Sequence, residues 1–138
     1  MTQLTYLWNI MQRASNRLEK INDLLKRELA LLIQNEVRDP RVGMASITEV
    51  RVSRDLSYAD VYVTILGKSD ASQAAESMAA LNRAGGFLRS LVAKNINLRT
   101  TPKFKFIFDD SIARGQHLSS LIDEALARDR NSHSSDDD

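Results

Sequence analysis

The first clear pattern along the chain is a helical spacing of apolar residues between residues 18 and 33. These residues recur every three or four positions and form a single stripe: Leu18, Ile21, Leu25, Leu29, Leu32 and Ile33. Such spacing predicts an amphipathic helix. Ser15 or Asn16 is expected to cap its start. The helix is expected to end near Arg38, because the following Asp39-Pro40 disfavours helical backbone.

Three later segments alternate apolar and polar residues, as β-strands do. Residues 44–53 are rich in β-branched side chains, and residues 58–66 direct Ala59, Val61, Val63 and Ile65 to one side. The four residues between these strands make a short turn, which predicts an antiparallel hairpin. In the third strand, residues 103–108, three phenylalanines point inward while Lys103 and Lys105 face outward.

Helical patterns fill the rest of the chain. Residues 71–83 are alanine-rich, follow a cap at Ser69 or Asp70, and are expected to bury Ala75, Met78, Ala79 and Leu81. Ala84-Gly85-Gly86 interrupts this pattern before it resumes over residues 87–95. Each glycine costs a helix about 1 kcal/mol relative to alanine, so we expect a bend between two helices. A last amphipathic helix follows Asp109-Asp110-Ser111.

The order helix, strand, strand, helix, bend, helix, strand and terminal helix predicts an α+β fold. One sheet face coated by helices makes a two-layer sandwich. We expect an N-terminal extension at 1–12, one domain at 13–127 and an acidic, disordered tail at 128–138. Two interpretations of residues 1–10 are open: they are an N-terminal extension, or translation starts at Met11.

Charge is unevenly distributed along the chain. The net charge is +1, but residues 131–138 carry three acids and no Lys or Arg, which leaves 19 basic and 15 acidic residues in the remainder. A run of bases without any acid lies between residues 83 and 105: Arg83, Arg89, Lys94, Arg99, Lys103 and Lys105. Lys and Arg bind RNA phosphates, so this run predicts an RNA-binding surface. Arg38 and Arg41 are further candidates, or they cap the helix and pair with Glu36 or Asp39.

Other chemistry finds little support in the sequence. Cysteine is absent, which fits a reducing cytoplasm and excludes thiolate metal sites. No apolar run is long enough to span a membrane. Asp109, Asp110, Ser111 and His117 are the candidates for catalysis, but the first three are expected to cap the last helix. We expect no enzyme activity, metal or cofactor.

Five sequence blocks, in order, resemble one protein family. They are Asp39-Pro40-Arg41 with Gly43-Met44, residues 52–63, residues 84–91, Leu98-Arg99-Thr100-Thr101-Pro102, and Phe108-Asp109-Asp110-Ser111-Ile112. They resemble the ribosome-binding factor A family, which has a type II K-homology (KH) fold. KH domains commonly hold nucleic acid with a Gly-x-x-Gly loop. Here Ala84-Gly85-Gly86 is similar to the Ala-x-Gly bend of the ribosome-binding factors.

This resemblance implies a ribosome assembly factor that binds immature small (30S) subunits through 16S rRNA and promotes rRNA processing. It implies transient binding near the decoding region, with assembly GTPases acting on the same subunit, and a cytoplasmic monomer. A generic KH-like module for single-stranded RNA or a protein is the alternative. A small hydrolase using Asp109, Asp110 or His117 is a third hypothesis.

Overall fold

The computed structural model describes residues 2–136, which form four helices and three strands. In chain order these are α1 (Thr2–Asn35), β1 (Ala45–Val52), β2 (Tyr58–Ile65), α2 (Ala75–Arg83), α3 (Gly85–Asn95), β3 (Lys103–Phe108) and α4 (Ser111–Asp136). The chain divides into two compact units at Phe108, so α4 belongs to a unit of its own. The element order is the one that the apolar pattern predicts.

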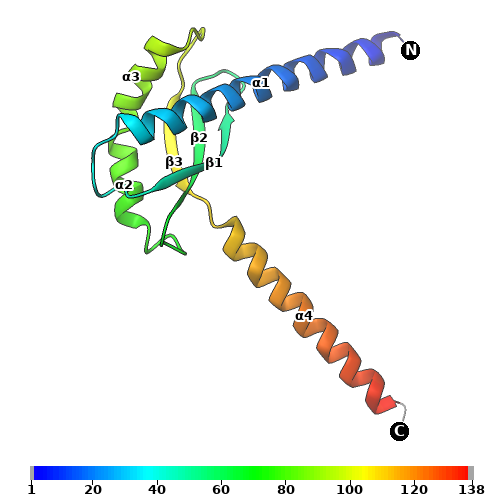
Figure 1. Cartoon of the computed structure of the whole chain (residues 1–138). Coiled ribbons are helices and arrows are strands. Elements are labelled where there is room, and N and C mark those ends of the chain that lie inside the picture. The colour runs from blue at the N-terminus through cyan, green and yellow to red at the C-terminus, as the bar shows by residue number, and fades with distance from the viewer. Residues whose placement is uncertain (1, 137–138) are drawn as a thin grey trace. The chain divides into compact units, whose positions relative to one another are not determined.

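The three strands form one sheet in the order β1-β2-β3 (Figure 1). β1 and β2 pair antiparallel through the turn at residues 53–57, which confirms the predicted hairpin, with a register shift between Ile47 and Glu49. β3 pairs parallel with β2, so the chain must cross back over the sheet, and it does so through α2 and α3.

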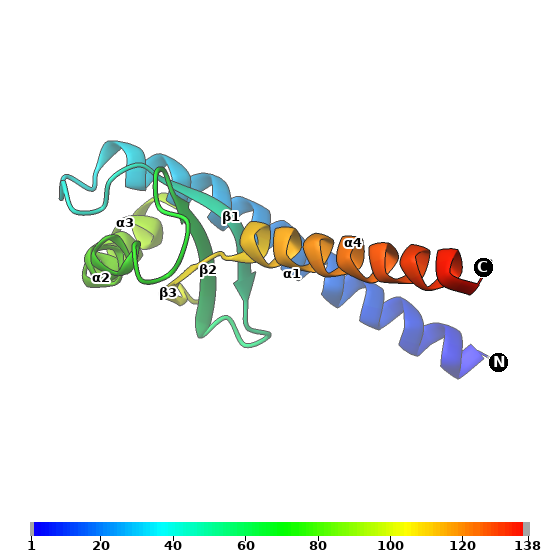
Figure 2. The ribbon, with the colours of Figure 1, turned by 90° about the horizontal axis from the view of Figure 1, so that it is seen from below.

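The core lies between one face of the sheet and the helices of the same unit. In Figure 2, α2 and α3 lie together on one side of the strands. The largest fully buried aliphatic side chains come from α1, β2, α2 and α3: Leu25, Leu29, Val61, Val63, Leu81, Leu88 and Val92. The arrangement is the predicted α+β two-layer sandwich, and it is consistent with a KH-like fold.

Helix α1 is longer at its start than the sequence pattern predicts. It begins at Thr2, so neither Ser15 nor Asn16 caps it, and the expected domain start at residue 13 falls within the helix. Residues 2–39 contain no glycine or proline, and Leu4, Leu7 and Met11 extend the helical spacing. These three side chains are exposed, so helix propensity and not core packing accounts for the extra turns.

Helix α2 buries only part of the face that the sequence predicts. It begins at Ala75 after a turn at 71–74, and Ser77 and Ala80 are buried in place of Ala75 and Ala79. Leu81 is buried as predicted, and Met78 is partly buried against the core. In an alanine-rich segment many positions are weakly apolar, so the spacing does not define one face. Asp70 organises the preceding turn, because its Oδ1 accepts the Gln73 backbone N–H at 2.8 Å.

The predicted bend between α2 and α3 is present. Ala84 stands between the helices with φ −77° and ψ −5°, and α3 begins immediately at Gly85. Gly85 is buried, and a Cβ atom there would lie 3.5 Å from the Phe104 carbonyl oxygen. Gly86 is exposed, and a Cβ atom there would meet nothing within 4 Å. Only the first glycine therefore faces the sheet.

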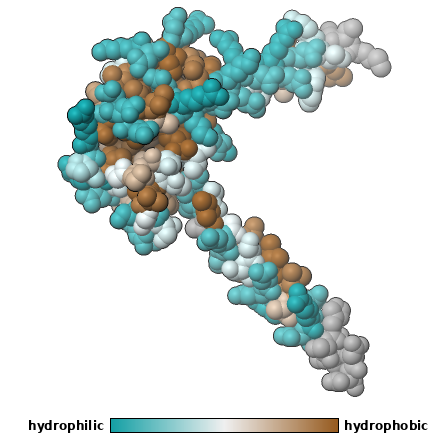
Figure 3. Space-filling model, in the orientation of Figure 1, coloured by the Kyte–Doolittle hydropathy of each residue, from teal (hydrophilic) through white to brown (hydrophobic). Residues whose placement is uncertain are grey.

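Helix α4 continues to Asp136, through residues expected to be a disordered tail from 128. No glycine or proline follows Gly115, and the Arg128–Glu124 pair at 3.5 Å supports the helix. Residues 128–136, expected as a disordered tail, are thus helical in the structure, while residues 137–138 lie outside the described part. The apolar side chains of α4 are exposed and form brown patches along it (Figure 3): Ile112, Leu118, Leu121, Ile122 and Leu126.

Candidate nucleic-acid interface

The sheet has an open face, which carries two of the predicted RNA-binding residues. Lys103 and Lys105 are exposed on β3, while Phe104 and Phe106 between and beyond them are buried, as the alternation predicts. The strand register sets Lys103 beside Tyr58 and Lys105 beside Asp60. The two ammonium groups therefore extend from the side of the sheet opposite the core.

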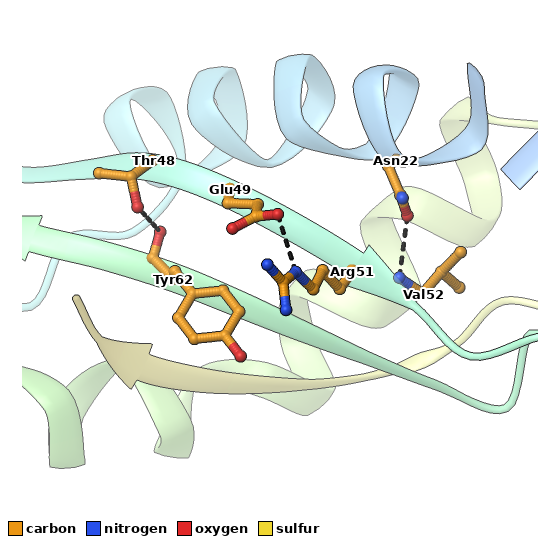
Figure 4. Close-up of polar contacts among 6 residues, drawn as sticks. All are labelled: Asn22, Thr48, Glu49, Arg51, Val52 and Tyr62. Atoms are coloured by element: carbon orange, nitrogen blue, oxygen red, sulfur yellow. Dashed lines mark hydrogen bonds and ion pairs between the residues drawn. The ribbon is translucent and has the colours of Figure 1, made fainter. Parts of the chain in front are cut away.

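On β1 and β2, the same open face carries a cluster of polar and aromatic side chains (Figure 4). The Arg51 guanidinium lies 5.7 Å from the centre of the Tyr62 ring. Its Nε donates to Glu49 at 2.8 Å, and this hydrogen bond raises the pKa of Arg51. Arg51 is thus engaged on two sides, so Lys103 and Lys105 are the better candidates for phosphate contact.

Two predicted residues lie on α3, in the helical layer. Arg89 is half-buried, and its Nε donates to the Thr101 carbonyl oxygen at 3.1 Å. Because Thr101 shortly precedes β3, this bond ties α3 to the start of that strand. Lys94 is exposed in the last turn of α3, where a positive charge is favourable to the helix dipole. Arg89 therefore has a structural contact that the sequence did not reveal.

The remaining predicted cations lie in loops or at a helix end. Arg99 is exposed in the loop between α3 and β3. Arg41 donates through its backbone N–H and its Nε to Asp39 Oδ1, at 3.0 and 3.3 Å, which confirms the pairing alternative for this residue. Arg38 is exposed in the same turn and has no ion pair to another residue that the structure describes.

Arg83 is exposed at the end of α2, and its charge acts on the Asp39 carboxyl. The pKa of the Asp39 carboxyl is lowered first by the hydrogen bond from the Arg41 backbone, and the charges of Arg41 and Arg83 lower it further. The run from Arg83 to Lys105 is not one continuous face: it starts at the end of α2, passes through α3 and the following loop, and ends on the open face of the sheet.

The sequence pattern did not single out a second group of cations. Arg13, Arg17 and Lys20 lie on α1 at helical spacing, and Arg54 lies in the β1–β2 turn. All four line hollows that Arg99 also lines. The spacing of three to four residues between Arg13, Arg17 and Lys20 could have indicated that these cations share one face of α1. Acidic residues lie near them in the sequence, however, so the segment shows no local surplus of positive charge.

Three of the four candidates for catalysis, Asp109, Asp110 and Ser111, have structural contacts. Asp109 Oδ1 accepts the Ser111 backbone N–H at 2.9 Å, which confirms the predicted capping of α4. Asp110 pairs with Arg114 at 2.8 Å, and His117 is exposed. In residues 2–136 no three His, Cys, Asp or Glu side chains come together as metal ligands. Over the same range, no helix has the length and apolar character to cross a membrane.

The fold and its exposed cations define a KH-like domain with basic surfaces. Comparison with known proteins is more specific, because a family model described as ribosome-binding factor A matches residues 17–122. The chain therefore belongs to the ribosome-binding factor A family. A ribosome-binding factor A from Chromohalobacter salexigens is 52% identical over 118 residues, covering 86% of this chain and 90% of that protein. One from Cellvibrio japonicus is 50% identical, covering 87% and 88%.

Solved structures agree with this assignment. The crystal structure of ribosome-binding factor A from Thermus thermophilus is 30% identical with a TM-score of 0.57, covering 65% of this chain and 93% of that one. A homology model of the Thermus thermophilus factor, fitted into a cryo-EM map of a complex with the 30S subunit, is 32% identical with a TM-score of 0.50. It covers 62% of this chain and 87% of that one.

Proposed function

We propose that this chain is a ribosome assembly factor that binds immature 30S subunits through 16S rRNA and promotes rRNA processing and subunit maturation. The observation that carries the proposal is family membership, joined to the 30S complex of the Thermus thermophilus relative. The factor acts by binding and not by catalysis. It works in the cytoplasm as a monomer, near the decoding region, and assembly GTPases act on the same subunit.

The open sheet face supplies a physical basis for contact with rRNA. Lys103 and Lys105 are exposed and have no ion pair to any residue that the structure describes. Unpaired ammonium groups can bind phosphate without first breaking a contact within the protein, and their binding releases counterions from the RNA. Lys94 and Arg99 present exposed charges in the neighbouring helix and loop, which would extend the contact around the edge of β3.

Sedimentation tests the proposal. In extracts of the native organism, the protein should migrate with free 30S subunits and be depleted from mature ribosomes. Deleting its gene should cause precursor 16S rRNA to accumulate, and the cloned gene should reverse this. A protein found only in the soluble fraction, together with normal 16S processing in the deletion strain, would refute the proposal.

The alternative is a generic KH-like module for single-stranded RNA or a protein. It is favoured only by the fold, since the Gly-x-x-Gly loop is replaced by Ala84-Gly85-Gly86. Competition separates the two functions. An assembly factor bound to 30S subunits should resist displacement by short single-stranded RNA, whereas a generic reader should be displaced in proportion to the competitor's concentration.

A further inference from the structure

A groove that shares only Arg99 with the predicted RNA-binding residues lies between three elements of the first unit. Among the described residues, two adjoining hollows of about 530 and about 750 Å³ separate α1 from the β1–β2 turn and the α3–β3 loop. Four residues line both hollows, which therefore lie side by side: Arg17, Ile21, Leu56 and Arg99. We refer to both hollows together as the α1 groove.

The α1 groove combines positive charge with apolar surface. Five cations line it, contributed by α1, the hairpin turn and the loop: Arg13, Arg17, Lys20, Arg54 and Arg99. Asp55 is the only acid in the described lining, and its carboxylate already accepts the Ser57 and Ser53 hydroxyls at 2.7 and 2.8 Å. Between the charges lie the aliphatic side chains of Ile21, Leu24, Leu56 and Leu98.

Leu56 reaches the groove through an unusual backbone conformation. Its φ is +60°, in the left-handed region that bulky residues rarely occupy. The turn holds it there, because Asp55 Oδ1 accepts the Ser57 backbone N–H at 3.1 Å and the Leu56 N–H donates to the Ser53 carbonyl oxygen at 2.9 Å. Such strained residues concentrate at binding sites. Here the strain places an apolar, half-buried side chain among arginines.

We infer that the α1 groove binds an unpaired segment of RNA. Its phosphates would contact Arg17, Arg54 and Arg99, while a base would lie against Leu56 and Leu98. Unpaired RNA offers both chemistries at once, since its bases are free to leave the stack and its backbone is anionic. A duplex keeps its bases inside and has no apolar surface for Leu56. This inference rests on the proposed function, because the segment would belong to the rRNA of the subunit.

The composition of the rim favours RNA over an acidic protein segment. Four of the five cations are arginines, and a guanidinium can both hydrogen-bond a phosphate and stack on a base. The rim also comes from three separate elements, so it can follow a backbone that carries a charge at every nucleotide. A protein occupant is the competing outcome of the test below.

The experiment uses the full chain and a fluorescent, unstructured RNA of about eight nucleotides, the size range of single-strand sites. The same RNA annealed to its complement is the duplex probe. The test variants are Arg17→Ala/Arg54→Ala, which spares the Arg83–Lys105 run, and Leu56→Asn, since asparagine tolerates positive φ. The control is Arg27→Ala, because Arg27 is exposed on α1 and does not line the groove. Thermal melting checks that each variant folds.

The inference predicts distinct effects of the two variants. Arg17→Ala/Arg54→Ala should weaken single-strand binding about tenfold at low salt and make its salt dependence shallower. Leu56→Asn should weaken it about threefold or more with an unchanged salt slope, because it removes apolar contact and no charge. Duplex binding should respond to the arginines only. Arg27→Ala should bind like the unaltered chain.

Binding to purified immature 30S subunits distinguishes the possible failures. Folded groove variants with unaltered affinity for the single strand would overturn the inference, and the proposed function would stand if they still bound subunits. Variants with weakened subunit binding yet full single-strand affinity would also overturn it, in favour of a protein occupant. An unaltered chain that binds the single strand but not subunits would support the groove and refute the proposed function.

Discussion

The side-chain amide of Asn82 pairs with both backbone groups of Phe106. Its Nδ2 donates to the Phe106 carbonyl oxygen at 3.2 Å, and its Oδ1 accepts the Phe106 N–H at 2.9 Å. β3 lies at the edge of the sheet, so this residue of α2 occupies the place of a further strand. At the opposite edge, Asn22 of α1 accepts the Val52 N–H at 2.8 Å (Figure 4). A helix side chain thus bonds the edge-facing backbone of one residue on each outer strand.

Asn82→Leu should destabilise the first unit by about 1 to 2 kcal/mol, because both backbone groups of Phe106 would be without their partner while some water can still reach them. Urea denaturation at neutral pH measures this effect. Asn95→Leu is the control, since the exposed Asn95 donates only to Glu28 at 2.8 Å and its loss should change stability by less than about 0.5 kcal/mol. Equal destabilisation in both variants would contradict the role of Asn82.

The two glycines of the bend should respond differently to valine. At Gly85 a Cβ atom would lie 3.5 Å from the Phe104 carbonyl oxygen, and the additional methyl groups of valine must displace the bend or β3. We expect Gly85→Val to cost about 1 to 3 kcal/mol, typical of overpacking. Gly86→Val faces open space and should be close to neutral, because valine has the better helix propensity. Equal thermal shifts would mean that both glycines contact the sheet.

The turn that holds Leu56 should weaken in acid. Hydrogen bonds from Ser57 and then Ser53 lower the pKa of Asp55 below its ordinary value of 3.8. Because the folded pKa is the lower one, this carboxylate stabilises the fold fully above the unfolded pKa, and the contribution disappears as pH falls through the folded pKa.

Asp55→Ala should therefore be less stable than the unaltered chain at about pH 6, and the difference should shrink at about pH 2. Chemical denaturation at both pH values measures it. Ser57→Ala, which removes the largest cause of the shift, should reduce the same pH dependence. A stability difference that stays constant between the two pH values would show that Asp55 acts through some contact other than its charged form.

Lys103 and Lys105 should contribute to rRNA binding through charge alone. Lys103→Ala/Lys105→Ala should weaken binding to immature 30S subunits and make the plot of log affinity against log salt shallower by about 1 for each phosphate that is no longer bound. Arg27→Ala/Arg128→Ala removes equal charge from exposed helix positions and should leave the slope unchanged. An unaltered slope in the lysine variant would place the rRNA-binding surface elsewhere.

Much of the fold could be predicted because its signals are local. The third strand has the bounds predicted for it, since three phenylalanines alternate with polar or outward residues between Pro102 and Asp109. The hairpin followed from two β-branched runs with a short link. Errors arose where local signals are weak: the alanine-rich α2 has no dominant face, and the first residues of α1 have no competing glycine or proline.

The candidate site was only partly predictable. Exposure of Lys103 and Lys105 follows from the period of a strand, whereas the bond from Arg89 to Thr101 joins residues brought together only by the crossover to β3. The clustering of the groove cations could not be predicted for the same reason. Arg17, Arg54 and Arg99 are far apart in sequence, and each is unremarkable among its neighbours along the chain.

By itself the sequence determined the order of the elements, the core-facing residues of β2 and β3 and most of those of α1, and the family to which the chain belongs. These depend on periodicity and on short motifs, which act over a few residues. Only the tertiary structure decided which charges share a surface. It divided the run from Arg83 to Lys105 among three regions, and it gathered Arg17, Arg54 and Arg99 around Leu56. The reason is that strand pairing and helix packing, and not distance along the chain, decide which side chains meet.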